Sequence, residues 1–345
     1  LDVLMQIFND PAREREEMYA LHDWLREREL TVLLTVKSDV GGRHVYPFLD
    51  FMADCVLFLD QRMQGQVRTR RLNVVKYRGS DFLSNEYPYV LSSKGIVLMP
   101  VSSMELAHQA PGAPVSSGNR QLDAVLGGGY PRGACILLAG ASGSGKTTLA
   151  CTFARAACQR DEKVLYVSFE EGRDSLVAGM RSAGIDLGAP LAAGTLTIET
   201  ALPESTGVEQ HLISLLGHIE AVAPKHVVID AVSACRRMGA EQAAFDFLVR
   251  LLTACKEQGI TCFYTNQIAG AEQAMEVSGY GISSLVDTLA LLEYRDDGRE
   301  LARRLLVIKS RGMNHSMKYH PFQVTDHGVA LEPAAEGPAI QGGRL

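Results

Sequence analysis

The sequence predicts an α/β fold of the P-loop type, with a mainly parallel sheet and helices on both faces. Three observations predict it. A glycine-rich loop joins an apolar strand to a helix, further apolar strands are separated by helix-length segments, and one of those strands ends in aspartate. The chain has 345 residues, of which 46% are hydrophobic and 21% are charged, so it is long enough for two ordinary globular domains.

The glycine-rich loop, Gly140–Thr148, follows the apolar run Ala134–Ala139 and precedes the helix-like segment Leu149–Arg155. Its glycines let backbone N–H groups converge on a polyphosphate, and the new helix directs its positive end to the same place. We therefore expect a nucleoside triphosphate here, with Lys146 on the β- and γ-phosphates and the Thr147 hydroxyl on Mg²⁺. The nucleotide-binding residues expected in the loop are Ser142, Gly143, Ser144, Gly145, Lys146, Thr147 and Thr148.

Three more apolar strands are expected, at Lys163–Phe169, Lys225–Asp230 and Gly259–Asn266. Like the strand before the loop, each is completed or followed by polar side chains, namely Glu170 and Glu171, Asp230, and Asn266. Because ligands of parallel sheets bind beyond the carboxyl ends of the strands, we expect these side chains to converge there.

These polar residues suggest catalytic and metal-binding roles. Asp230 ends a Walker B-like strand, so it is expected to bind Mg²⁺ together with Thr147 and Glu170, although an Asp here could instead cap the next helix. Glu170 and Glu171 are expected to orient and deprotonate an attacking oxygen, the alternative being solvated acids in a first helical turn. Asn266 is a candidate sensor of the γ-phosphate or a turn-forming residue.

Two cations, Lys309 and Arg311, close the expected strand Arg304–Ile308. Their one-residue spacing directs both side chains the same way. We expect them to reach a phosphate bound on a neighbouring subunit, as arginine fingers do, and the alternative is a basic surface at a strand end. The same pattern recurs at Lys76 and Arg78.

That recurrence belongs to an internal repeat, because residues 49–100 align without a gap on residues 282–333. Upstream, an expected strand at Leu30–Thr35 matches Ile260–Thr265. So long a period indicates a duplicated domain, and the first copy lacks a phosphate loop, so we expect a fragment of a longer two-domain chain. The expected divisions are the C-terminal half of a first domain at 1–101, a linker at 102–114, a complete second domain at 115–335 and a flexible tail at 336–345.

Composition restricts the setting of the protein. The net charge of −6 and the single tryptophan, Trp24, give no general attraction for nucleic acid. No apolar run has the length of a membrane span, and no secretion signal is recognisable, so a cytoplasmic location is expected. Seven scattered cysteines without a C-x-x-C pair argue against a disulfide framework and against zinc.

Together these motifs resemble the KaiC family of RecA-like P-loop ATPases over nearly the whole chain. The specific markers are Phe169–Gly172, the segment that runs from Leu122 through Leu126–Gly129 to Gly133, and Lys309–Ser316. The resemblance implies a hexameric ring with ATP and Mg²⁺ at the subunit interfaces. It implies KaiB-like or signalling proteins as possible partners.

The resemblance also implies roles for individual residues. Glu170 and Glu171 would be the catalytic pair, and Lys309 and Arg311 would act from the adjacent protomer. Arg303 matches a nucleotide-contacting arginine, and Arg237 matches an interface arginine near the phosphoacceptors.

Members of the family phosphorylate an adjacent Ser-Thr pair in their second domain, where this chain has Ser283 and Ser284. The aligned residues of the first copy, Asp50 and Phe51, cannot accept a phosphoryl group. Without the resemblance, two serines here would indicate only surface polarity.

The leading functional hypothesis is a Mg-ATP-dependent ATPase and serine/threonine autokinase that regulates signalling or circadian timing. One alternative is a recombinase-like ATPase that binds single-stranded DNA. Another is a scaffold that assembles on ATP and hardly turns it over.

Overall fold

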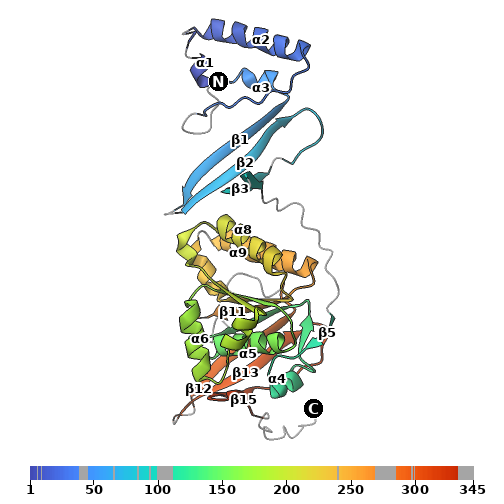
Figure 1. The fold of residues 1–345 in the computed structure, drawn as a ribbon, viewed down its shortest axis with the longest axis vertical. Helices are drawn as coiled ribbons and strands as arrows, with labels where there is room; N and C mark the ends of the chain where they lie inside the picture. The colour runs from blue at the N-terminus through green and yellow to red at the C-terminus, as the bar shows by residue number, and fades with distance from the viewer. Residues whose placement is uncertain are drawn as a thin grey trace, which may run out of the picture. The chain divides into compact units, whose positions relative to one another are not determined.

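A computed structural model of the chain describes residues 1–5, 7–8, 10–38, 46–64, 67–83, 85–92, 95–98, 112–238, 241–268, 285–296, 298 and 300–332. The chain divides into two compact units (Figure 1). The smaller unit comprises Leu1–Met63 and Arg68–Pro100, and the larger comprises Val101–Leu345 with residues 64–67.

The larger unit is built on a nine-stranded sheet in the order β15-β14-β13-β12-β7-β11-β10-β8-β9. Strands β12, β7, β11, β10, β8 and β9 run parallel to one another, and β12 to β15 form an antiparallel meander. The strands are β7 (Cys135–Gly140), β8 (Val164–Ser168), β9 (Leu196–Thr200), β10 (His226–Asp230), β11 (Thr261–Gln267), β12 (Thr288–Asp296), β13 (Leu301–Ser310), β14 (His320–Thr325) and β15 (Gly328–Leu331). The predicted α/β fold with a mainly parallel sheet is confirmed.

Helices cover both faces of this sheet. Phe263 of β11 stacks on Phe153 of α5, whereas the adjacent Cys262 contacts Cys255 of α9. Successive strand residues point to opposite faces, so α5 and α9 lie on opposite sides. The helices are α4 (Arg120–Val125), α5 (Lys146–Gln159), α6 (Arg173–Ser182), α7 (Gly188–Ala193), α8 (Val208–Val222) and α9 (Glu241–Glu257), with 3₁₀ turns at Pro203–Ser205 and Val232–Met238. None of the helices in the described ranges has the length and apolar character needed to cross a membrane.

The smaller unit holds a four-stranded sheet in the order β1-β2-β3-β4 and a small core of Met5, Met18 and Met52. Its strands repeat the order of β12 to β15 in the larger unit, and the last strand of each unit, β4 and β15, begins and ends at aligned residues. The elements are α1 (Asp2–Met5), α2 (Pro11–Glu27), α3 (Leu49–Met52), β1 (Cys55–Gln64), β2 (Val67–Tyr77), β3 (Glu86–Ser92) and β4 (Gly95–Leu98). The domain duplication that the sequence predicts is therefore present in the structure.

The predicted strand at Leu30–Thr35 is wrong, because residues 31–37 form no ladder. Its counterpart β11 lies between β7 and β10 and exchanges hydrogen bonds with both. The described part of the smaller unit has no strand equivalent to either neighbour, and an extended segment without neighbours has no ladder to join.

The same difference affects one face of the smaller sheet. Leu57 and Leu59 of β1 are 52% and 47% exposed, whereas their counterparts Ala290 and Leu292 are 3% and 1% exposed. In the larger unit these counterparts belong to the core that α5 covers. Both copies of the meander thus carry apolar side chains on the face that helix α5 buries in the larger unit.

The last residues of the expected linker form part of a strand. Residues 112–114 belong to β5 (Gly112–Val115), which pairs with β6 (Tyr130–Arg132) in the larger unit. The rest of that linker and the predicted tail lie outside the described residues.

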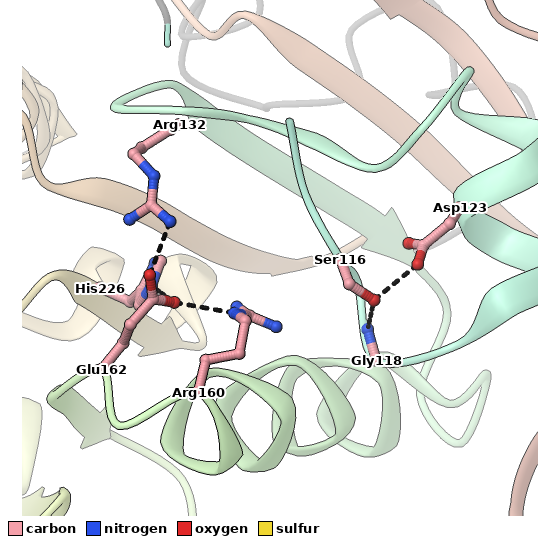
Figure 2. A network of polar contacts seen from close by, with 7 residues as sticks. All are labelled: Ser116, Gly118, Asp123, Arg132, Arg160, Glu162 and His226. Atoms are coloured by element: carbon pink, nitrogen blue, oxygen red, sulfur yellow. Dashed lines mark hydrogen bonds and ion pairs between the residues drawn. The ribbon is translucent and has the colours of Figure 1, made fainter. Parts of the chain in front are cut away.

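A polar network lies at the amino edge of the parallel strands of the larger unit (Figure 2). Glu162 lies at its centre and accepts hydrogen bonds from Arg132 (2.6 Å), Arg160 (2.9 Å) and the ring Nε2 of His226 (2.9 Å). Burial lowers the pKa of His226, so the ring is neutral and its Nε2–H donates. Burial alone would raise the pKa of Glu162, but the three donors outweigh it and lower that pKa to about 2.

We expect Glu162→Ala to lower the free energy of unfolding by about 2 to 4 kcal/mol, because it leaves the buried His226 without its acceptor. The folded-state pKa of Glu162 is depressed, so its contribution to stability is full above pH 4.5 and is lost as the pH falls towards 2. Denaturant unfolding of both proteins at several pH values measures this. Glu162→Gln is the matched control, because it retains an acceptor, and an equal loss in both variants would contradict the explanation.

Candidate functional site

The glycine-rich loop follows the wholly buried strand β7 and ends where α5 begins at Lys146. Gly143 and Gly145 have φ angles of 72° and 100°, which favour glycine. A Cβ atom on Gly140 would lie 2.6 Å from the carbonyl oxygen of Leu292. The chain can therefore turn this tightly between strand and helix only with glycine at these positions.

Lys146 lies inside the loop with 8% of its surface exposed. Its Nζ donates to the carbonyl oxygens of Gly140 (2.9 Å) and Ala141 (2.7 Å). Burial lowers the pKa of Lys146, and the carboxylates of Asp230 and Glu170 act in the opposite direction. The loop thus holds a desolvated cation, which a bound anion would stabilise.

Asp230 ends β10 and is 5% exposed. Its Oδ2 accepts from the Tyr166 hydroxyl of β8 (2.7 Å), and its Oδ1 accepts from the Thr265 hydroxyl of β11. The alternative of a helix cap does not match this geometry, because both donors belong to neighbouring strands and not to the segment that follows. The carboxylate is held rigidly, and its remaining lone pairs suit a cation or its water ligands.

Glu170 and Glu171 follow β8 and precede α6, whose first-turn acid is Asp174. The alternative of first-turn acids therefore does not describe them. The Ser168 hydroxyl donates to the carbonyl of Glu171 (2.7 Å) and accepts from its N–H (3.1 Å), which fixes this turn. Partial desolvation and then the charge of Asp230 raise the pKa of Glu170, against the influence of Lys146.

Asn266 is buried in β11 beside Ala139, and Gln267 pairs with Gly140. Asn266 belongs to a strand and not to a turn, so the turn-forming alternative does not describe this residue. Its place is at the carboxyl edge of the sheet, next to the start of the loop.

Arg303 reaches the loop from β13, and its Nε donates to the carbonyl of Gly143 (3.3 Å). Tyr294, its cross-strand partner, donates from its hydroxyl to the carbonyl of Ser142 (3.4 Å). The guanidinium lies 5.8 Å from the Tyr294 ring centroid. Tyr294, Tyr166 and Thr265 were not predicted from the sequence, because their roles depend on which strands become neighbours in the sheet.

Arg237 lies in the 3₁₀ turn after β10 and pairs with Glu204, at 2.6 Å from Nε to the carboxylate. Its positive charge also lowers the pKa of Glu170. Ser283 and Ser284 lie outside the described residues.

Lys309 and Arg311 lie at the opposite edge of the sheet from the loop. Ser310 pairs with Thr288, which pairs with Ile136 near the start of β7. The four residues from Ile136 to Gly140 span roughly 13 Å of strand, so neither cation reaches the loop of its own chain.

Comparisons with known proteins identify the family of the chain. The family model described as "ATPase: KaiC" matches residues 1–103 and 115–336. Circadian clock protein KaiC2 from Synechocystis is 34% identical over 99% of this chain and 61% of its own length. A circadian clock oscillator protein KaiC from Parathermosynechococcus lividus is 31% identical over 98% of this chain and 63% of its own length.

A third relative, circadian clock protein KaiC3 from Synechocystis, is 30% identical over 96% of this chain and 67% of its own length. The chain thus spans about three fifths to two thirds of the length of these relatives. The match to the family model covers both copies of the repeat and the whole carboxyl-edge site. The chain belongs to the KaiC family of ATPases.

Proposed function

We propose that this chain hydrolyses ATP and transfers the γ-phosphoryl group to its own Ser283 and Ser284, within a hexameric ring of like subunits. The observation that carries the proposal is the electrostatic coupling at the carboxyl edge. Asp230 and Glu170 both raise the pKa of Lys146, and Lys146 lowers that of Glu170. A cation for the phosphates and a base of raised pKa therefore lie within reach of one another.

For nucleotide binding, the backbone N–H groups of the loop and α5 would hold the phosphates. Lys146 would exchange the carbonyls of Gly140 and Ala141 for phosphate oxygens. Thr147, Asp230 and Glu170 would hold Mg²⁺, which when bound neutralises charge developing on the phosphate oxygens. Arg303 and Asn266 would contact the nucleotide from the adjacent strands.

For the chemical step, Glu170 would take the proton of the attacking oxygen, with Glu171 beside it. When Ser283 or Ser284 attacks, the Oγ–P bond forms while the bond from Pγ to the bridging oxygen breaks, and ADP leaves. The hydroxyl proton passes to Glu170. With water as nucleophile, the same steps release phosphate.

Lys309 and Arg311 would complete the site from the adjacent subunit, and their distance from the loop of their own chain supports this. Arg237 would lie at the same interface, near the phosphoacceptors. The relatives carry circadian clock names. We extend to this chain a role in timing or signalling, through KaiB-like or other signalling proteins.

Incubation with γ-labelled ATP followed by site mapping tests the proposal. We expect label on Ser283 or Ser284, and we expect it to disappear in Ser283→Ala/Ser284→Ala while phosphate release continues. Phosphate release with no label on the protein would exclude the autokinase. A turnover rate stimulated by single-stranded DNA and suppressed by salt would favour the recombinase alternative. ATP binding without turnover would favour the scaffold.

A further inference from the structure

Asp287 directly precedes β12, and its carboxylate contacts three different elements of the larger unit. Its Oδ2 accepts from the backbone N–H of Cys135 (2.8 Å) and pairs with Nζ of Lys256 (2.8 Å). Its Oδ1 lies 3.9 Å from Nη1 of Arg311. One carboxylate therefore connects the start of β7, the end of α9 and the end of β13.

The backbone of Asp287 makes two of these connections as well. Its N–H donates to the carbonyl of Cys135 (2.8 Å), and its carbonyl accepts from the N–H of Arg311 (2.9 Å). The Asp287 side chain is 8% exposed, whereas that of Arg311 is 56% exposed. The anchored end of Arg311 is thus fixed to the sheet, and its guanidinium extends towards the surface.

The charges at this place require such an anchor. Lys256, Lys309 and Arg311 lie around the carboxylate of Asp287. Desolvation and then the nearby Arg311 lower the pKa of Lys309, while Asp287 acts in the opposite direction. Without the carboxylate, three cations would repel one another and the guanidinium would turn away.

The smaller unit contains the same arrangement at the aligned positions. The N–H of Arg78 donates to the carbonyl of Asp54 (2.9 Å), and its Nη1 donates to the Asp54 carboxylate (3.1 Å). The aspartate–arginine pair therefore forms in both copies. Only the copy that holds the phosphate loop adds the buried Lys256 contact and the contact with β7.

We propose that Asp287 is a positioning residue for ATP turnover, which holds Arg311 in the orientation that meets the nucleotide of a neighbouring copy. The inference rests on the proposed function, because Arg311 is assigned there to the neighbour's site. Asp287 itself touches no nucleotide and acts only through Arg311.

A double-mutant cycle tests this on the full chain. The variant Asp287→Asn/Lys256→Gln removes both buried charges, so that no unpaired ammonium is left to unfold the protein. We expect kcat to fall about 10- to 100-fold and the Kd for ATP to stay within about twofold. In an Arg311→Ala background the same pair of changes is expected to lower kcat no further. Asp54→Asn is the matched control and is expected to leave kcat unchanged.

Each other outcome overturns the inference. An equal fold-loss in both backgrounds would show that Asp287 acts independently of Arg311. An unchanged kcat in the folded variant, with folding checked by thermal melting, would show that the anchor is not used. If Arg311→Ala alone leaves kcat unchanged, the proposed role of Arg311 fails, and this inference fails with it.

Discussion

Glu170→Gln is expected to lower kcat for ATP turnover by about 100- to 1,000-fold while leaving the Kd for ATP within a few-fold. The amide keeps the shape of the side chain but cannot accept the proton of the attacking oxygen. Single-turnover kinetics and equilibrium binding separate the two effects. Glu171→Gln is the matched control. We expect a smaller loss there, because Ser168 binds only the backbone of Glu171, which the substitution keeps.

The raised pKa of Glu170 gives this prediction a pH dependence. The carboxylate is the active base, so turnover should rise with pH as Glu170 loses its proton. The raised pKa of Glu170 has the opposite effect on stability. The folded state binds this proton more tightly than the unfolded state, so the free energy of unfolding falls as the pH rises. Above that pKa the charge therefore costs stability, and Glu170→Gln should melt at a higher temperature near neutral pH. A lower melting temperature, or an equal loss of kcat in Glu171→Gln, would contradict the assignment.

Mixing subunits that carry Lys146→Ala with subunits that carry Arg311→Ala is expected to recover about a quarter of the native ATPase rate, although each variant alone turns over ATP far more slowly than that. A competent site needs an intact loop from one subunit and an intact Arg311 from the next. Random assembly of two variants in equal amounts gives that combination at about one interface in four. ATPase assays on co-refolded mixtures measure the recovery.

The control for this experiment replaces the Lys146→Ala subunit with one that carries both substitutions. The mixture then contains no intact Arg311, so no recovery is expected. Absence of recovery in the first mixture, with mixed assembly verified by mass, would mean that the site does not draw Arg311 from a neighbour.

Much of the site could be predicted because its signals are local in the sequence. A glycine-rich turn after an apolar run fixes the loop, and strands that end in Asp230 or precede Glu170 must meet at one edge of a parallel sheet. The supporting residues could not be found in this way. Tyr166 and Thr265 are recognisable only once β8 and β11 lie on either side of β10.

Two other features depend on pairing across the sheet. The sequence does not show at which edge of the sheet the strand that contains Lys309 ends. In the structure β13 runs antiparallel to β12, so its end lies at the edge away from the loop. The pattern at Leu30–Thr35 suits a strand, yet strand formation needs neighbours that the described smaller unit does not contain. The residue types of a segment therefore indicate that it could form a strand, but they do not show whether neighbouring strands are present to pair with it.

The meander that appears in both units also bears on the order of folding. Its strands pair with their neighbours in the chain, so each closes only a short loop. The parallel half pairs Cys135 with Cys262, which lie far apart in the sequence. Since low contact order favours fast formation, the part of the fold that carries Arg311 is expected to form early. The loop and its carboxylates come together only in the slower, non-local stage.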